Sequence, residues 1–175
     1  MSTLLPAEDQ PSASPFPSPL DSKPEAKSKD SADSQPRTVL LLEDNPTDVF
    51  VIKEVLERCR LNLRLRVVDN GLDALQYLQD SDRDTSSPCP ALVLLDLNVP
   101  KVHGFEVLRR LRGGSRCHRT PVVVVTSSTA ESDRAAAQRL GAEAYFEKPK
   151  DLTAYMELER VIKRVLGVPE VGEGH

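Results

Sequence analysis

The stretch Ala91-Leu92-Val93-Leu94-Leu95-Asp96 decides how this chain folds. Five apolar residues in a row, ended by an acid, are typical of a strand that is buried on both faces of a parallel sheet. Two similar apolar runs, 39–42 and 122–125, lie before and after it in the sequence. We therefore predict that these three segments are the central strands of one parallel sheet.

Weaker patterns complete the sheet and supply its helices. Residues 63–67 alternate apolar and basic side chains, which favours an edge strand with one solvent-exposed face. A fifth short strand is expected at 144–146. A fourth helix is expected to end near Leu140, before Gly141. Apolar residues spaced three and four apart mark the other helices: Val49, Ile52 and Leu56; Leu72, Leu75 and Leu78; Phe105, Leu108 and Leu111; and a last helix over 152–166.

Five strands that alternate with five helices predict an α/β, doubly wound parallel sheet over residues 37–167, with right-handed crossovers. Its ligand site should lie outside the carboxyl ends of the strands. Before this domain, Pro and Ser supply 15 of the first 36 residues, so we expect 1–36 to be a disordered tail. Residues 168–175 are expected to form a short C-terminal tail.

Composition excludes several classes of protein. A net charge of −4 without a basic cluster argues against direct nucleic-acid binding. No apolar run is long enough to span a membrane, and the N-terminal residues lack the features of a signal peptide. Cys59, Cys89 and Cys117 are odd in number and widely spaced, which favours free thiols in a reducing cytoplasm over a disulfide framework or a zinc site.

Polar residues follow the predicted strands at the rim where a ligand should bind. Glu43 and Asp44 follow the first strand, Asp96 the third, Thr126 ends the fourth and Lys148 follows the fifth. Each alone would more often be a helix cap or a solvated loop residue. Together, three carboxylates would repel one another unless a cation such as Mg²⁺ lay among them. A carboxylate nucleophile, a metal, a lysine and a hydroxyl are the groups that transfer through an aspartyl phosphate requires.

Two other chemistries fit these residues less well. A flavin phosphate would meet the acidic loop 43–46 where this class of fold usually has Ser, Thr and Gly. Phosphatases of the haloacid dehalogenase type carry a second acid two residues after the nucleophile, but Asn98 occupies that position here.

From about residue 38 to 166 the chain resembles the receiver family of bacterial two-component response regulators, including the chemotaxis response regulator. Thr126 lies 30 residues after Asp96, and Lys148 lies 22 residues after Thr126, which are the usual intervals in that family. The motifs that carry the resemblance are Glu43-Asp44-Asn45, Asp96-Leu97-Asn98-Val99-Pro100 with Gly104, Thr126-Ser127, and Tyr145-Phe146-Glu147-Lys148-Pro149.

The resemblance implies a flavodoxin-like (βα)₅ fold with strand order 2-1-3-4-5. It implies that Asp96 accepts a phosphoryl group from a sensor histidine kinase or a phosphotransfer protein, and that Lys148 contacts the phosphoryl oxygens. Mg²⁺ would be held by Asp44, Asp96 and the backbone carbonyl of Asn98. Glu43, where many members carry Asp, would act through a water molecule.

The resemblance also implies a switch. Thr126 would move to hydrogen-bond the phosphoryl group, and Tyr145 would swing into the space that Thr126 leaves. Pro149 would follow a cis peptide bond that holds Lys148 in place.

The loop 79–90 and the motifs around Asp48 and Asn98 look like those of stand-alone receivers that partner phytochrome-type histidine kinases. Output would then come through protein contacts, since few residues follow Leu166, and a homodimer through the last helix fits such a receiver. The leading interpretation is a phosphoacceptor signalling domain rather than an enzyme that acts on a separate substrate. A scaffold that works without phosphorylation and an aspartyl-phosphate phosphatase are the alternatives.

Overall fold

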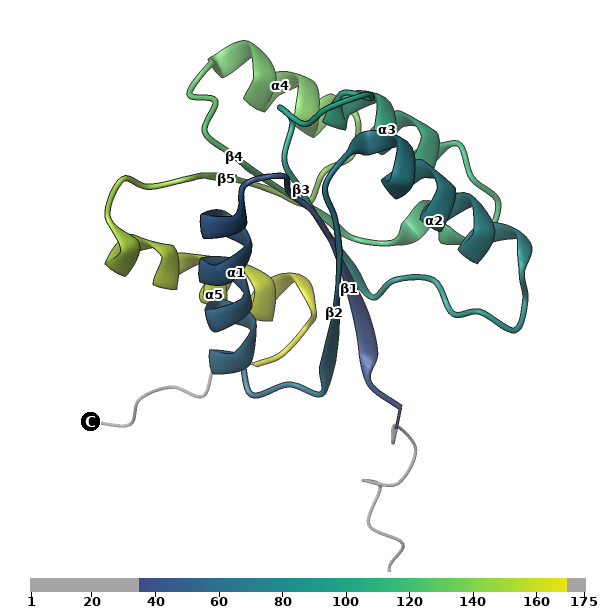
Figure 1. Cartoon of the computed structure of the whole chain (residues 1–175), viewed down its shortest axis with the longest axis horizontal. Helices are drawn as coiled ribbons and strands as arrows, with labels where there is room; N and C mark the ends of the chain where they lie inside the picture. The colour runs from purple at the N-terminus through teal and green to yellow at the C-terminus, as the bar shows by residue number, and fades with distance from the viewer. Residues whose placement is uncertain (1–34, 170–175) are drawn as a thin grey trace, which may run out of the picture. The chain divides into compact units, whose positions relative to one another are not determined.

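A computed structural model describes residues 35–169, and the fold is a parallel sheet covered by helices on both faces (Figure 1). The expected tail over 1–36 lies almost wholly outside the described residues, as does most of 168–175. Within residues 35–169 five strands alternate with five α-helices, and the strand order is β2-β1-β3-β4-β5. The predicted α/β class and strand order are confirmed.

The elements follow the chain in strict alternation. The strands are β1 Arg37–Leu42, β2 Leu63–Val68, β3 Leu92–Leu95, β4 Val122–Thr126 and β5 Ala144–Glu147. The helices are α1 Pro46–Arg58, α2 Gly71–Arg83, α3 Gly104–Arg112, α4 Glu131–Arg139 and α5 Met156–Val165, with 3-10 turns η2 Cys117–Arg119 and η3 Leu152–Tyr155.

Burial separates the central strands from the edge strands as the sequence predicts. Every residue of β3 and β4 is buried, as are the last four of β1, because helices cover both faces of these strands. In β2, Arg64 and Arg66 are exposed while Leu63 and Leu65 are half-buried. This strand pairs only with β1, so its alternating pattern belongs to an edge.

Helices cover both faces of the sheet (Figure 1), and an apolar cluster lies on each face. On one face α1 and α5 pack on the side chains of alternate strand residues, with Ile52 and Ile162 fully buried. On the other face α2, α3 and α4 pack on the remaining strand residues, with Leu78, Leu108 and Ala137 in the core. Successive side chains of each strand point to opposite faces of the sheet, so each strand contributes side chains to both apolar clusters.

The second helix differs from its predicted pattern. Leu72, expected on the buried stripe, is 53% exposed, and the buried positions are Ala74, Leu75 and Leu78. The helix also continues to Arg83, into residues expected to form a loop, and Ser81 in this last turn is buried. Contacts with the segment before β4 explain the extension, because Asp82 and the carbonyl of Ser81 both bind residues 115–117.

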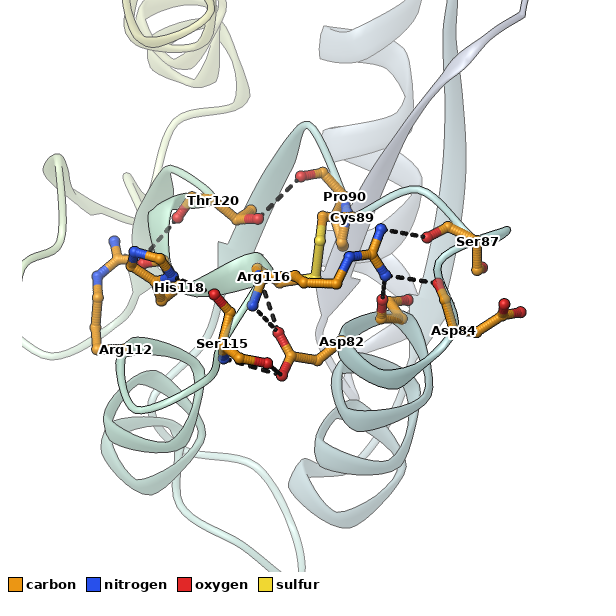
Figure 2. The surroundings of a disulfide bond; sticks show 12 residues. Asp82, Asp84, Ser87, Cys89, Pro90, Arg112, Ser115, Arg116, His118 and Thr120 are labelled. Atoms are coloured by element: carbon orange, nitrogen blue, oxygen red, sulfur yellow. Dashed lines mark hydrogen bonds between the residues drawn. A yellow bond between two sulfur atoms is a disulfide. The ribbon is translucent and has the colours of Figure 1, made fainter.

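The expectation of three free cysteines is wrong: Cys89 and Cys117 form a disulfide, with their Cα atoms 5.4 Å apart, and only Cys59 is free (Figure 2). Cys89 lies just before β3 and Cys117 just before β4. These strands are parallel neighbours, so their starts lie at the same end of the sheet. The pairing depends on this topology, which the spacing of the cysteines along the chain does not reveal.

Hydrogen bonds join the same two segments around the disulfide (Figure 2). The carboxylate of Asp82 accepts from the backbone N–H groups of Ser115, Arg116 and Cys117 and from the Ser115 hydroxyl. The Arg116 guanidinium donates to the carbonyls of Ser81 and Asp84 at 2.7 and 2.6 Å. This end of the sheet is therefore cross-linked by a covalent bond and by hydrogen bonds.

Within the described part of the chain, no helix combines the length and the apolar character needed to cross a bilayer.

Reduction of the disulfide should destabilise the protein. The bond joins residues 28 apart, and closing a loop of this size removes unfolded-state entropy worth about 3.6 kcal/mol. Urea unfolding with and without reductant measures the difference. The Cys89→Ser variant serves as control, because reductant should leave its unfolding free energy unchanged. Titration of three free thiols in the unreduced, unfolded protein would contradict the bond itself.

Asp82 should make stability depend on pH at the acid end. Its hydrogen bonds from Cys117, Ser115 and Arg116 hold the pKa of the carboxyl well below its usual range. The contribution of Asp82 to the free energy of unfolding is therefore complete above the pKa of this carboxyl in the unfolded chain, roughly 3.9. That contribution is lost as pH falls toward the pKa of the carboxyl in the folded protein. Asp82→Asn should destabilise the protein at neutral pH. The difference in unfolding free energy between the variant and wild type should become smaller in acid. Urea unfolding at a series of pH values tests this prediction, with the exposed Asp80→Asn as control. A difference in unfolding free energy that stays constant with pH would refute the prediction.

Candidate functional site

The predicted site residues meet at the carboxyl ends of the strands. Leu42 of β1 pairs with Leu95 of β3, so the residues that follow them, Glu43 and Asp96, lie level with each other. The Asp96 N–H donates to the Leu42 carbonyl at 3.0 Å and fixes this register. The order in which the chain adds strands reverses at this point. β2 is added on one side of β1, whereas β3, β4 and β5 are added in turn on the other side. Ligands of doubly wound sheets bind at this kind of position.

Lys148 reaches the same point from β5. Thr126 of β4 pairs with Glu147, and the Lys148 N–H donates to the Thr126 carbonyl at 2.8 Å. The Lys148 ammonium then contacts three carboxylates: Glu43 Oε2 at 2.6 Å, Asp96 Oδ2 at 2.8 Å and Asp48 Oδ2 at 2.9 Å. An ammonium has three N–H donors, so each one has a charged acceptor.

This ion cluster is largely withdrawn from water. The side chains of Glu43, Asp96 and Lys148 are 1%, 6% and 9% exposed. Burial by itself would lower the pKa of Lys148, but hydrogen bonds to Asp96, Glu43 and Asp48 outweigh it and raise that pKa above its usual value. Burial raises the pKa of Glu43, against the opposing effect of Lys148. The cation that the crowded acids require is thus supplied in this structure by Lys148.

Three carboxylates at the rim are arranged as a candidate metal site. Glu43, Asp44 and Asp96 each offer an oxygen, and these oxygens lie within 4.8 Å of one another. Asp44 is exposed, so the cluster opens to solvent on one side. Hard divalent cations such as Mg²⁺ prefer oxygen ligands and keep several waters or phosphate oxygens. The donor set and its open side therefore fit Mg²⁺.

The loop after β3 is held tightly against the site. Asp96 Oδ1 accepts from the Asn98 N–H at 3.1 Å, which leaves the exposed Asn98 directly beside the acid cluster. Gly104 begins α3 and donates its N–H to the Leu97 carbonyl. A Cβ at Gly104 would clash with the backbone of Asp96 and Leu97, so only glycine allows α3 to approach the site this closely.

Thr126 and Tyr145 connect the site to the loop before α4. Thr126 is fully buried, and its Oγ1 accepts from the Ser128 N–H at 3.3 Å. The Tyr145 hydroxyl donates to the Ser128 carbonyl at 2.9 Å, and the Arg134 guanidinium stacks over the Tyr145 ring. Both side chains therefore bind the backbone of the same loop residue, one at its N–H and the other at its carbonyl.

Two residues of the site were not identified from the sequence. Asp48 enters the sequence prediction only as part of a motif, and Tyr155 lies only within the last helix, expected over 152–166. The Tyr155 hydroxyl donates to Asp48 Oδ1 at 2.9 Å, while Asp48 Oδ2 accepts from Lys148. The available signal was weak: Asp48 is an acid in the first turn of a helix that begins at the rim.

The expected cis peptide bond before Pro149 is absent: the Lys148–Pro149 bond is trans in the structure. Trans is the favoured isomer even before proline. Lys148 is instead held by its backbone bond to Thr126 and by its three carboxylate partners.

Comparisons with known proteins agree with this geometry. The family model of the response regulator receiver domain matches residues 39–158. Response regulator Rcp1 of Synechocystis sp. is 38% identical over 117 residues, which are 67% of this chain and 80% of Rcp1. The crystal structure of Mn²⁺-bound Rcp1 superposes with a TM-score of 0.68 at 33% identity, covering 80% of this chain and all of Rcp1.

A second solved relative is the phosphorylated cyanobacterial phytochrome response regulator RcpA. It gives a TM-score of 0.67 at 30% identity and covers 74% of this chain and 93% of RcpA. Residues 39–158, which the family model matches, contain all the strand-end residues described above. From its fold, its site and these matches, the chain belongs to the response regulator receiver domain family.

Proposed function

We propose that this protein is a response regulator that accepts a phosphoryl group on Asp96 from a sensor histidine kinase or a phosphotransfer protein. One observation carries the proposal: Asp96 lies at the centre of the site, with Lys148 on one oxygen and an open acid cluster beside it. An Asp96 oxygen attacks the phosphorus of a phosphohistidine, the P–N bond breaks, and the imidazole leaves with its electron pair and takes up a proton.

Asp44, Asp96 and the backbone carbonyl of Asn98 would hold Mg²⁺ in this function, with Glu43 acting through a water molecule. When bound, the ion neutralises charge on the phosphoryl oxygens as they approach the acids. Lys148 supplies a second positive charge, already placed 2.8 Å from Asp96. Mn²⁺ in the related Rcp1 structure and phosphorylation of the related RcpA support both parts of this proposal.

The output is proposed to be a change in protein contacts. Thr126 would turn its hydroxyl from the Ser128 N–H to a phosphoryl oxygen, which would loosen the loop before α4. Tyr145 binds the carbonyl of that same residue, so its position would change with the loop. The surface formed by α4, β5 and α5 would then differ between the two states.

A phytochrome-type histidine kinase is the proposed partner, because the solved relative RcpA is a phytochrome response regulator. We place this exchange in the cytoplasm, where such a kinase would present its phosphohistidine. A scaffold that works without phosphorylation is less consistent with the site, since the acceptor, the lysine and the acid cluster are all assembled. A phosphatase role lacks the second acid, because Asn98 stands two residues after Asp96.

Incubation with acetyl phosphate and Mg²⁺ should add one phosphoryl group to the protein, seen by intact mass spectrometry. Asp96→Asn should abolish the added mass, because the amide is not a nucleophile of this kind. The exposed Asp80→Asn is the matched control and should label like wild type. Labelling that persists in Asp96→Asn would refute the acceptor, and an unlabelled wild type would favour the scaffold.

Removal of the lysine charge should destabilise the metal-free protein. Lys148→Met leaves the buried carboxylates of Glu43 and Asp96 without their cation, a type of change that costs about 3–5 kcal/mol. Excess Mg²⁺ should restore part of the loss and should bind the variant more tightly than wild type. Urea unfolding in chelator and in Mg²⁺ measures both effects, with exposed Lys150→Met as control. Equal stability of the two variants in chelator would contradict the described ion cluster.

A further inference from the structure

Asp48 differs from the other two partners of Lys148. Glu43 and Asp96 belong to the acid cluster that fits a divalent cation, whereas Asp48 does not. It lies in the first turn of α1, where Asn45 caps the helix through the N–H groups of Thr47 and Asp48. The partial positive charge of a helix N-terminus favours a carboxylate at this position. Asp48 thus lies beside Lys148 in the first turn of α1, outside the acid cluster.

Tyr155 fixes the orientation of the Asp48 carboxylate. The two Asp48 oxygens have separate partners, the Tyr155 hydroxyl and the Lys148 ammonium, both at 2.9 Å. Tyr155 is only 3% exposed and packs in the core with Phe146, whose ring centroid is 6.0 Å away. Since a packed aromatic ring has little freedom, its hydroxyl can set the position of Asp48 accurately.

A change in charge at the site would leave Asp48 as the constant partner of Lys148. A divalent cation in the acid cluster would compete with Lys148 for Glu43 and Asp96, and a phosphoryl group would alter Asp96 itself. A lysine side chain has a flexible four-carbon stem, so an ammonium that loses two of its partners would otherwise move. Asp48 would still accept a hydrogen bond from the Lys148 ammonium in the metal-bound and in the phosphorylated protein.

We propose that Asp48, oriented by the buried Tyr155 hydroxyl, is a positioning residue that anchors the Lys148 ammonium beside Asp96 for phosphoryl transfer. The proposal rests on the proposed function for its effect on rate, but the anchoring itself does not need phosphorylation. A group preorganised toward developing charge accelerates transfer without reorganising during the reaction. Loss of the anchor should therefore slow transfer while metal binding is retained.

The test uses Asp48→Asn and Tyr155→Phe, each of which nearly preserves the shape of the side chain. The controls are Asp80→Asn, exposed on α2, and Tyr77→Phe, whose ring packs beside Arg66 away from the site. Circular dichroism and thermal unfolding check that each variant folds. Should Asp48→Asn fail to fold, Tyr155→Phe carries the test, because it removes only one hydroxyl oxygen.

The first measurement is the ¹H–¹⁵N signal of the Lys148 ammonium in the metal-free, unphosphorylated protein. Three hydrogen bonds and burial should slow proton exchange enough for the signal to be seen, and Lys148→Met assigns it. We expect the signal to broaden or vanish in Asp48→Asn and to weaken in Tyr155→Phe. An unchanged signal in both variants would overturn the proposal.

The second measurement is the rate of Asp96 labelling at saturating acetyl phosphate, together with the affinity for Mg²⁺. A lost hydrogen bond between charged groups corresponds to about tenfold in rate for Asp48→Asn, and about threefold is expected for Tyr155→Phe. Mg²⁺ affinity should stay within about twofold of wild type, because Asp48 lies outside the acid cluster. Wild-type rates in both variants would overturn the proposal, as would a parallel loss of Mg²⁺ affinity.

The two proposals can fail separately. If wild type does not label, the phosphoacceptor function is wrong, and the Lys148 signal alone then decides whether Asp48 anchors the ammonium. If wild type labels and the variants match it in rate and signal, only the positioning role is wrong.

Discussion

The buried ammonium of Lys148, surrounded by three carboxylates, is the interaction on which the rest of the site depends. Charges withdrawn from water are tolerated only when they are paired and hydrogen-bonded, and each N–H of this ammonium has a charged acceptor. The partners come from the ends of β1 and β3 and from the first turn of α1. One side chain from β5 thus joins elements that are far apart in the sequence.

The two ends of the sheet are held by different kinds of contact. Before β3 and β4, the Cys89–Cys117 disulfide and the bonds of Asp82 and Arg116 join the loops. At the carboxyl ends, the described contacts of the site are ion pairs and hydrogen bonds, which respond to a change in charge. A covalently cross-linked base and an electrostatically held rim suit a domain whose rim is proposed to gain and lose a phosphoryl group.

Thr126 and Tyr145 connect the proposed phosphorylation site with the loop before α4. Both bind the backbone of Ser128, one at its N–H and the other at its carbonyl. Loss of either contact would remove one restraint on this loop residue. The site and the loop before α4 thus share one residue, which is a physical basis for the proposed switch.

The amino-acid sequence by itself determined the layered fold and the rim at which Glu43, Asp44, Asp96, Thr126 and Lys148 meet. Apolar runs and helical spacing are local patterns, and the carboxyl ends of parallel strands must share one edge. Only the tertiary structure decided that Cys89 bonds to Cys117, that Leu72 faces solvent, and that Tyr155 binds Asp48. Each of these depends on which segments become neighbours in space and how their side chains are turned, and no spacing along the chain carries that information.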